Sequence, residues 1–165
     1  MPSKKKKAVE ADKDGNRLIS RNRKAYHDYT ITDTLEAGLV LVGSEIKSIR
    51  AGKVNLRDSY VTFRDGEAWL VGAHIASYAQ ASYLDHDPRR DRKLLLHRRE
   101  INRLRVRVEQ RGFTIVPTRL YLKNNRAKVQ IGLARGKHTY DKRQSLAKRD
   151  SDRAMQRAIK DATRR

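Results

Sequence analysis

Apolar and polar residues alternate in several short segments along the middle of the chain. Residues 29–35 interleave aromatic and aliphatic residues with threonines, and this period of two predicts a strand with one buried face. Residues 59–64 and 68–75 follow a similar pattern on either side of Asp65–Gly66, a pair typical of a tight hairpin turn. These segments predict antiparallel strands.

A second hairpin is predicted near the end of the periodic region. Residues 114–123 and 126–134 flank Asn124–Asn125, and the second arm alternates aliphatic with basic or polar residues. Pro117 has no backbone N–H to give to a neighbouring strand, which predicts a bulge or a sheet edge at that position.

Two segments have helical rather than strand spacing. Residues 43–52 place two isoleucines three positions apart, with Ser44 as a candidate N-terminal cap. Residues 97–112 carry a longer helical pattern that a glycine ends, and His97 and Glu100 have the spacing of a capping box.

The segments between the two hairpins complete the prediction of the fold class. Residues 80–92 are polar, contain a proline and are expected to form a loop, and 94–96 is a short apolar run that suits a further strand. Short antiparallel strands with one helix between two hairpins are typical of a small barrel. The predicted fold is mainly β: an OB-like antiparallel barrel of about six strands, with two or three short flanking helices and a basic C-terminal tail.

The two ends of the chain differ from this periodic middle. Residues 1–16 are polar and low in complexity, and are expected to form a disordered basic arm. Residues 135–165 carry eleven Lys and Arg against four Asp, with few large apolar residues, so they cannot form a core alone. One folded domain over residues 17–134, followed by a basic tail, is the expected organisation.

The charge indicates the class of partner. The 165 residues include 39 Lys and Arg against 19 Asp and Glu, a formal net charge of +20. Such a field attracts polyanions, which means nucleic acid or an anionic membrane. No apolar run approaches the roughly 20 residues that span a bilayer, and no apolar stretch follows the basic start as in a secretory signal. We therefore expect a cytoplasmic, nucleic-acid-binding protein without a membrane partner.

Enzyme chemistry finds little support in the sequence. Cysteine is absent, and the five histidines lie at spacings unlike those of a zinc site. Asp85, Asp87 and Asp91 form an acidic cluster, but arginines interleave with them, which favours a solvated, ion-paired loop. Neither a P-loop nor a G-x-S-x-G motif occurs. We expect no catalytic residue, metal, cofactor or small-molecule substrate.

Basic and aromatic residues favour RNA as the partner. Tyrosine rings stack on unpaired bases while Arg and Lys neutralise phosphates. Trp69 and Tyr29 lie on the apolar phase of predicted strands and suit the core instead, whereas Tyr140 lies in a polar stretch with no core to enter. The residues alone also allow a structural ribosomal protein that binds rRNA, or an RNA-processing enzyme with an unrecognised carboxylate site.

Six short motifs narrow this choice. They are Asn22–Tyr29, Glu36–Gly38, Gly43–Arg50, Arg92–Leu96, Gly132–Lys137 and Asp141–Arg143. In this order and spacing they resemble the small protein B family, the SsrA-binding proteins, from about residue 17 to the end of the chain. The resemblance implies an OB-like barrel that binds the tRNA-like domain of transfer-messenger RNA and brings it to stalled 70S ribosomes, without performing bond chemistry.

The resemblance also implies residues of the RNA site. Asn22, Glu36 and Leu95 match positions that the family uses to contact or support the RNA, and a carboxylate is able to accept from base amino groups. Without the resemblance, an exposed turn would be favoured for Glu36 and core packing for Leu95. The neighbouring basic residues expected to hold phosphates are Arg21, Arg23 and Lys24.

The tail resembles the family's functional tail, which is disordered when free and helical in the mRNA channel of the small subunit. An isolated helix of this length is marginal in water, and a polyanionic channel would stabilise a column of arginines. The residues implied at the decoding centre and along the channel are Gly136, Lys137, Tyr140, Asp141, Lys142, Arg143, Arg149, Arg153, Met155, Arg157 and Ile159.

One position departs from the family pattern. Tyr140 stands where some relatives have a histidine that is proposed to stack on a decoding-centre base. A tyrosine ring stacks equally well but does not titrate near neutral pH. Tyr140 therefore fits a stacking role and does not fit a role that needs a proton.

Overall fold

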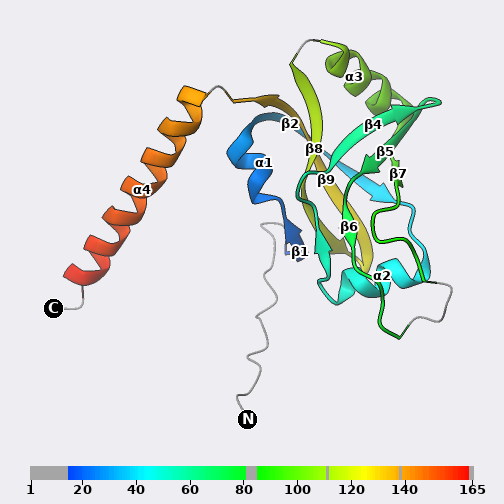
Figure 1. Ribbon diagram of the computed structural model, residues 1–165, viewed down its shortest axis with the longest axis horizontal. Coiled ribbons are helices and arrows are strands. Elements are labelled where there is room, and N and C mark those ends of the chain that lie inside the picture. The colour runs from blue at the N-terminus through cyan, green and yellow to red at the C-terminus, as the bar shows by residue number, and fades with distance from the viewer. Residues whose placement is uncertain (1–14, 81–84, 111, 138, 164–165) are drawn as a thin grey trace.

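The computed structural model describes residues 15–80, 85–110, 112–137 and 139–163 (Figure 1). Six strands pair in a closed ring in which every pairing is antiparallel. In ring order they are β2 (Tyr29–Leu39), β9 (Arg126–Gly136), β8 (Phe113–Lys123), β4 (Tyr60–Arg64), β5 (Glu67–Val71) and β7 (Arg92–Leu95). The prediction of a mainly β fold with about six antiparallel strands is confirmed.

Three further strands lie outside this ring. The sequence pattern had not indicated β1 (Arg17–Arg21), which pairs with β8 at residues 119–122, beyond the point where β4 pairs with β8 at Ile115. A separate two-stranded sheet joins β3 (Val54–Asn55) to β6 (His74–Ile75). These three strands are too short to show a periodic pattern in the sequence. Their positions therefore could not be predicted without knowing the strands with which they pair.

Both predicted hairpin turns are confirmed by their backbone angles. Asp65 and Gly66 have φ of 51° and 74°, and Asn124 and Asn125 have φ of 49° and 60°. Two consecutive residues with positive φ form the turn whose twist matches that of the strands it joins. The predicted irregularity at Pro117 is a bulge, because the register between β8 and β9 shifts there, in a strand with neighbours on both sides.

In the described part of the chain, four helices accompany the strands: α1 (Arg23–Asp28), α2 (Gly43–Arg50), α3 (Arg98–Glu109) and α4 (Thr139–Ala162). The capping box of α3 is confirmed, because the His97 N–H donates to a Glu100 carboxylate oxygen at 2.9 Å. The prediction that Ser44 caps α2 is wrong. The N-cap is Val42 and the helix begins at Gly43, whereas the Ser44 hydroxyl meets the His86 ring at 2.8 Å.

The core fills the inside of the ring. Alternate residues of β9 are buried from Ala127 to Leu133, while Lys128 and Gln130 lie on the other face. Leu70 of β5, Leu94 of β7 and Ile115 of β8 belong to the same core cluster, and α2 and α3 lie at the two ends and add Ile49 and Leu104 (Figure 1). Period-two alternation therefore produces a ring that is apolar inside and polar outside.

A buried ion pair fastens the loop before β7 to α2. The Glu45 and Arg92 side chains are fully buried and meet at 2.9 Å, and Arg90 adds a second guanidinium at 2.7 Å. Arg92 also donates to the main-chain oxygens of Ala73 and Pro88, at 2.7 and 3.1 Å. The prediction of a solvated loop is thus wrong for Arg92, because a carboxylate from α2 compensates its charge in the core.

Helix α4 stands to one side of the barrel (Figure 1). From Arg143 to Thr163 its side chains are exposed, apart from half-buried Ser145. The expected arm over residues 1–16 lies almost wholly outside the described residues. The expectation that the tail gains order only on the ribosome stays a prediction.

Candidate nucleic-acid interface

A row of polar residues crosses four neighbouring strands on the outer face of the barrel. Glu36 on β2 lies opposite Gln130 on β9, which lies opposite Arg119 on β8, which lies opposite Arg21 on β1. Directly opposed residues project from the same face of a sheet. Glu36 and Arg21, on strands that β9 and β8 separate in the sheet, are therefore parts of one surface.

Glu36 is held by two residues of β8. It accepts hydrogen bonds from the Tyr121 hydroxyl and, at 3.4 and 3.5 Å, from the Lys123 ammonium. The Tyr121 hydrogen bond is the main cause that lowers the pKa of Glu36; partial burial opposes it, and Lys123 and Lys128 assist it. The Glu36 carboxylate is therefore ionised near neutral pH and presents only acceptors to a ligand.

Leu95 projects into solvent from β7, and 55% of its surface is exposed. It lies opposite Gly38 of β2, where a Cβ would be 3.2 Å from the Leu95 Cβ. The missing side chain at Gly38 thus makes room for Leu95 to lie across β2. The favoured alternative, that Leu95 packs in the core, is wrong.

Leu95 separates two hollows. One, of about 360 Å³, has an apolar wall formed by residues such as Leu41, Ile46 and Ala127. The other, of about 380 Å³, is lined by Glu36, Leu96, His97, Glu100 and Lys128. The surface offers an apolar side and a charged side within reach of one ligand.

The basic residues around Glu36 were missed by sequence reasoning. Lys123, Arg126 and Lys128 line a further hollow beside Glu36, next to the turn of the second hairpin. Their alternation with the buried residues of β9 was visible, but alternation indicates only that a residue faces solvent. It does not indicate which strand lies next to it.

Asn22 is placed differently from the other predicted RNA residues. It is 95% buried and caps α1, accepting from the Ala25 N–H at 3.1 Å. Its amide donates to the main-chain oxygens of Leu56 and Pro117 at 3.0 and 2.9 Å. The structure therefore gives Asn22 a supporting position, from which it sets the course of the basic residues beside it.

Those neighbouring basic residues are exposed. Arg21 lies 6.0 Å from the centre of the Tyr26 ring and continues the row toward Glu36. Arg23 projects from the first turn of α1, and Lys24 forms an ion pair with Asp58 at the mouth of a 170 Å³ hollow.

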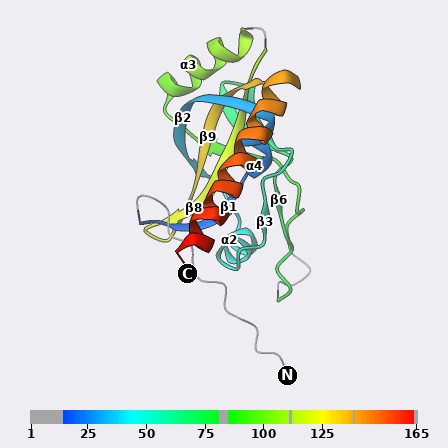
Figure 2. The same cartoon turned by 90° about the vertical axis from the view of Figure 1, so that its left-hand side faces the viewer.

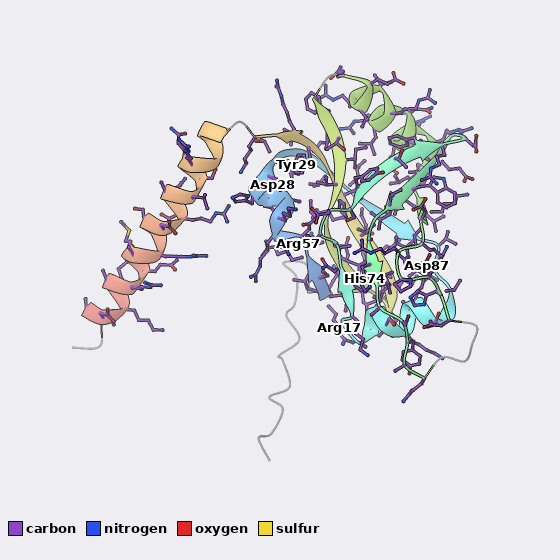
Figure 3. The ribbon with its side chains drawn as sticks, in the orientation of Figure 1. Arg17, Asp28, Tyr29, Arg57, His74 and Asp87 are labelled. Carbon is purple, nitrogen blue, oxygen red and sulfur yellow. The ribbon has the colours of Figure 1, made fainter. Side chains whose placement is uncertain are left out.

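The root of the tail is anchored on α1. Gly136 lies opposite Tyr29, where α1 passes into β2 (Figure 3). The Lys137 N–H donates to the Asp28 carbonyl and its ammonium to the Tyr26 carbonyl, both at 3.0 Å. These contacts fix the point at which α4 leaves the barrel.

The other predicted tail residues belong to α4. The side chains of Tyr140, Asp141 and Lys142 lie outside the described residues. Met155 and Ile159 lie four residues apart on α4 and are 64% and 61% exposed. The barrel therefore does not cover these two apolar side chains. The exposed basic residues are Arg143, Arg149, Arg153 and Arg157.

Two features are absent from the described residues. No group of three or more His, Asp or Glu side chains is placed to hold a metal ion. No helix in the described part of the chain is long and apolar enough to cross a membrane.

A closed antiparallel barrel with arginine and lysine across its outer face defines a basic β-barrel protein whose surface suits a polyanionic ligand. The model of the SmpB protein family matches residues 19–161. The chain belongs to this family.

Individual relatives are similar over almost their whole length. An SsrA-binding protein of Roseiflexus sp. (strain RS-1) is 60% identical, over 92% of this chain and 97% of the relative. One of Limosilactobacillus fermentum is 53% identical, over 87% and 91%. A solved chain described as "tmRNA-SmpB: a journey to the center of the bacterial ribosome" is 51% identical with a TM-score of 0.63, covering 73% of this chain and 85% of that one.

Proposed function

We propose that this chain binds the tRNA-like domain of transfer-messenger RNA and delivers it to stalled ribosomes for peptide tagging and ribosome rescue. Close relatives are named for binding SsrA RNA, and the similar solved chain is described as tmRNA-SmpB in the bacterial ribosome. The observation that carries the proposal for this chain is that Glu36 on β2, Leu95 on β7 and Arg21 on β1 lie on one outer face.

Each group on this face has a role that suits an RNA loop. The ionised Glu36 accepts from base amino groups, and Tyr121 holds it in place. Leu95 packs against an unstacked base, since RNA loops splay their bases outward. Arg21, Arg23 and Lys24 neutralise phosphates, with Asn22 fixing the helix that carries two of them.

The tail is proposed to act on the small subunit. Gly136 and Lys137 set the direction of α4, and Tyr140 stacks on a decoding-centre base beside Asp141, Lys142 and Arg143. The apolar residues Met155 and Ile159 pack against the channel wall. The column that meets phosphates in the mRNA channel consists of Arg149, Arg153 and Arg157.

The proposed work of the chain is recognition and delivery in the bacterial cytoplasm. Transfer-messenger RNA and the stalled 70S ribosome are the partners, and the ribosome carries out all bond chemistry. A structural ribosomal protein would instead be present on every 70S particle, even without stalling. Counting copies per 70S particle in unstressed cells separates these two functions.

Replacing Glu36 tests the proposed RNA site. Glu36→Arg is expected to weaken binding to the tRNA-like domain by about tenfold or more, because one good base contact contributes about 1–3 kcal/mol. The free energy of unfolding should fall by about 0.5–1.5 kcal/mol, because Glu36 is exposed but the variant removes the acceptor of the Tyr121 hydroxyl. Fluorescence titration and thermal unfolding measure the two quantities.

Glu67 provides a matched control for this experiment. Its side chain is 40% exposed against 36% for Glu36, and each carboxylate pairs with one lysine. Glu67→Arg makes the same change of charge away from the row and should leave RNA affinity unchanged. Equal effects of the two variants would show that Glu36 acts only through overall charge.

A further inference from the structure

Helix α3 carries a surface that the proposed RNA site does not use. Its twelve residues include five arginines against two glutamates, and every arginine is exposed. Ile101 and Leu104 hold its opposite side against the core. Arg99, Arg103 and Arg107 lie four residues apart, so they share one side of the helix at steps of about 6 Å.

This line of arginines begins at the RNA site. His97 and Glu100, at the start of α3, line the same hollow as Glu36 and Leu95. Arg99 therefore lies next to the mouth of that hollow. From there α3 runs back along β2, because Arg103 forms an ion pair with Asp33 of that strand.

The line ends near the root of the tail. The guanidinium groups of Arg107 and Arg135 both lie 5.8 Å from the centre of the Phe113 ring. Arg135 lies opposite Phe113 and Thr30 and directly precedes the last residue of β9. Figures 1 and 2 accordingly show α3 at the same end of the barrel as the start of α4.

We propose that Arg99, Arg103, Arg107 and Arg135 form a track for the phosphate backbone of the RNA strand whose bases bind at Glu36 and Leu95. The inference rests on the proposed function and extends its site. A step of about 6 Å along a helix is comparable to the spacing of successive phosphates in one strand. The aromatic ring between Arg107 and Arg135 holds both guanidiniums while leaving their N–H groups available to an anion.

The line of arginines on α3 is continuous with the Glu36 site. This favours binding of the same RNA molecule at both places over binding of a second RNA by α3. A strand that leaves the hollow at Leu95 meets Arg99 first, and the ion pair of Arg103 with Asp33 is exposed enough to exchange for a phosphate. The track thus guides the strand from the base-reading hollows toward the point where the tail begins.

The test is the salt dependence of binding by the full chain. The triple variant R99Q/R103Q/R107Q is titrated with an isolated tRNA-like domain between about 50 and 200 mM salt, the range over which phosphate contacts show most clearly. The slope of log affinity against log salt should fall by about two to three, since each lost phosphate contact removes about 0.7–0.9. The variant R99K/R103K/R107K keeps the charges and should keep the slope.

R50Q/K53Q/R89Q is the matched control. It removes three charges from exposed residues around α2, which lies at the other end of the barrel from α3 (Figure 1). It should leave the slope at the wild-type value. A slope unchanged in the α3 variant, or lowered equally in both variants, would overturn the track.

Two further outcomes separate this inference from the function on which it rests. An α3 variant that keeps its slope on the RNA fragment but loses binding to 70S particles would assign the arginines to ribosomal RNA and overturn the proposal. A wild-type chain that binds unrelated structured RNA as tightly as the tRNA-like domain would contradict the proposed function itself. If the wild type prefers the tRNA-like domain to unrelated RNA, and the α3 variant keeps the wild-type salt slope, only the arginine track is contradicted.

Discussion

A chain that ends at Lys137 is expected to bind the tRNA-like domain as tightly as the full chain and to support no peptide tagging. The Glu36 row and the hollows beside Leu95 belong to the barrel and its hairpin. Gly136 and Lys137 are retained because they pair with Tyr29 and Asp28. The cut therefore removes α4 and leaves the contacts that close β9.

The stability of the barrel should be almost unaffected by this cut. The described side chains of α4 beyond Lys142 are exposed, apart from half-buried Ser145, so little apolar burial is lost. The readouts are RNA affinity by titration, the free energy of unfolding by denaturant, and tagging of a peptide on ribosomes stalled in a purified translation system. Loss of RNA affinity in the shortened chain would contradict the division of labour between barrel and tail.

Glu45→Ala is expected to cost about 3–5 kcal/mol of folding free energy, the typical effect of removing one partner from a buried ion pair. The replacement leaves Arg92 with a buried charge, and Arg90 and the Val42 N–H also lose their acceptor. A domain of this size is stabilised by about 5–15 kcal/mol in total. Denaturant unfolding should therefore show a midpoint far below that of the wild type.

An exposed pair supplies the control for Glu45. Glu109 lies 3.9 Å from Arg105 across one turn of α3, and both side chains are more than half exposed. Glu109→Ala should change the free energy of unfolding by no more than about 0.5 kcal/mol. A loss at Glu45 as small as that at Glu109 would show that Arg92 finds another partner or water.

The same ion pair predicts how stability depends on pH. Burial raises the pKa of Glu45, but hydrogen bonds from Arg90, Val42 and Arg92 outweigh it and lower the pKa overall. A carboxylate with a lowered pKa in the folded state contributes stability above its unfolded pKa, and this contribution is lost as the pH falls toward the folded value. The wild type should therefore lose more stability in acid than Glu45→Gln does.

The hairpins and the barrel follow from local signals in the sequence. Asp65–Gly66 and Asn124–Asn125 adopt positive φ readily, and period-two alternation fixed which face of β9 is buried. Helix α1 was missed although Asn22 is a strong capping residue, because only six residues follow before β2 begins. β1 was missed because a strand of five residues is identified by its partner rather than by its own pattern.

The site was less accessible to sequence reasoning than the fold. Glu36 and Leu95 were found through a family resemblance, and physical pattern alone had favoured ordinary roles for both. The burial of Arg92 depends on Glu45, 47 positions earlier, and no local pattern relates the two. The role of Tyr121 could not be predicted from the sequence, since its hydrogen bond to Glu36 exists only once β2, β9 and β8 lie side by side.

The RNA recovered with the chain from bacterial cells tests the central claim most directly. The full chain is purified under native conditions at moderate salt, and the bound RNA is sequenced and compared with total RNA. A face that recognises a tRNA-like fold predicts one dominant long RNA with a tRNA-like end, enriched far above its share of the cell. Recovery of 16S and 23S rRNA in their cellular proportions, without that enrichment, would contradict the account.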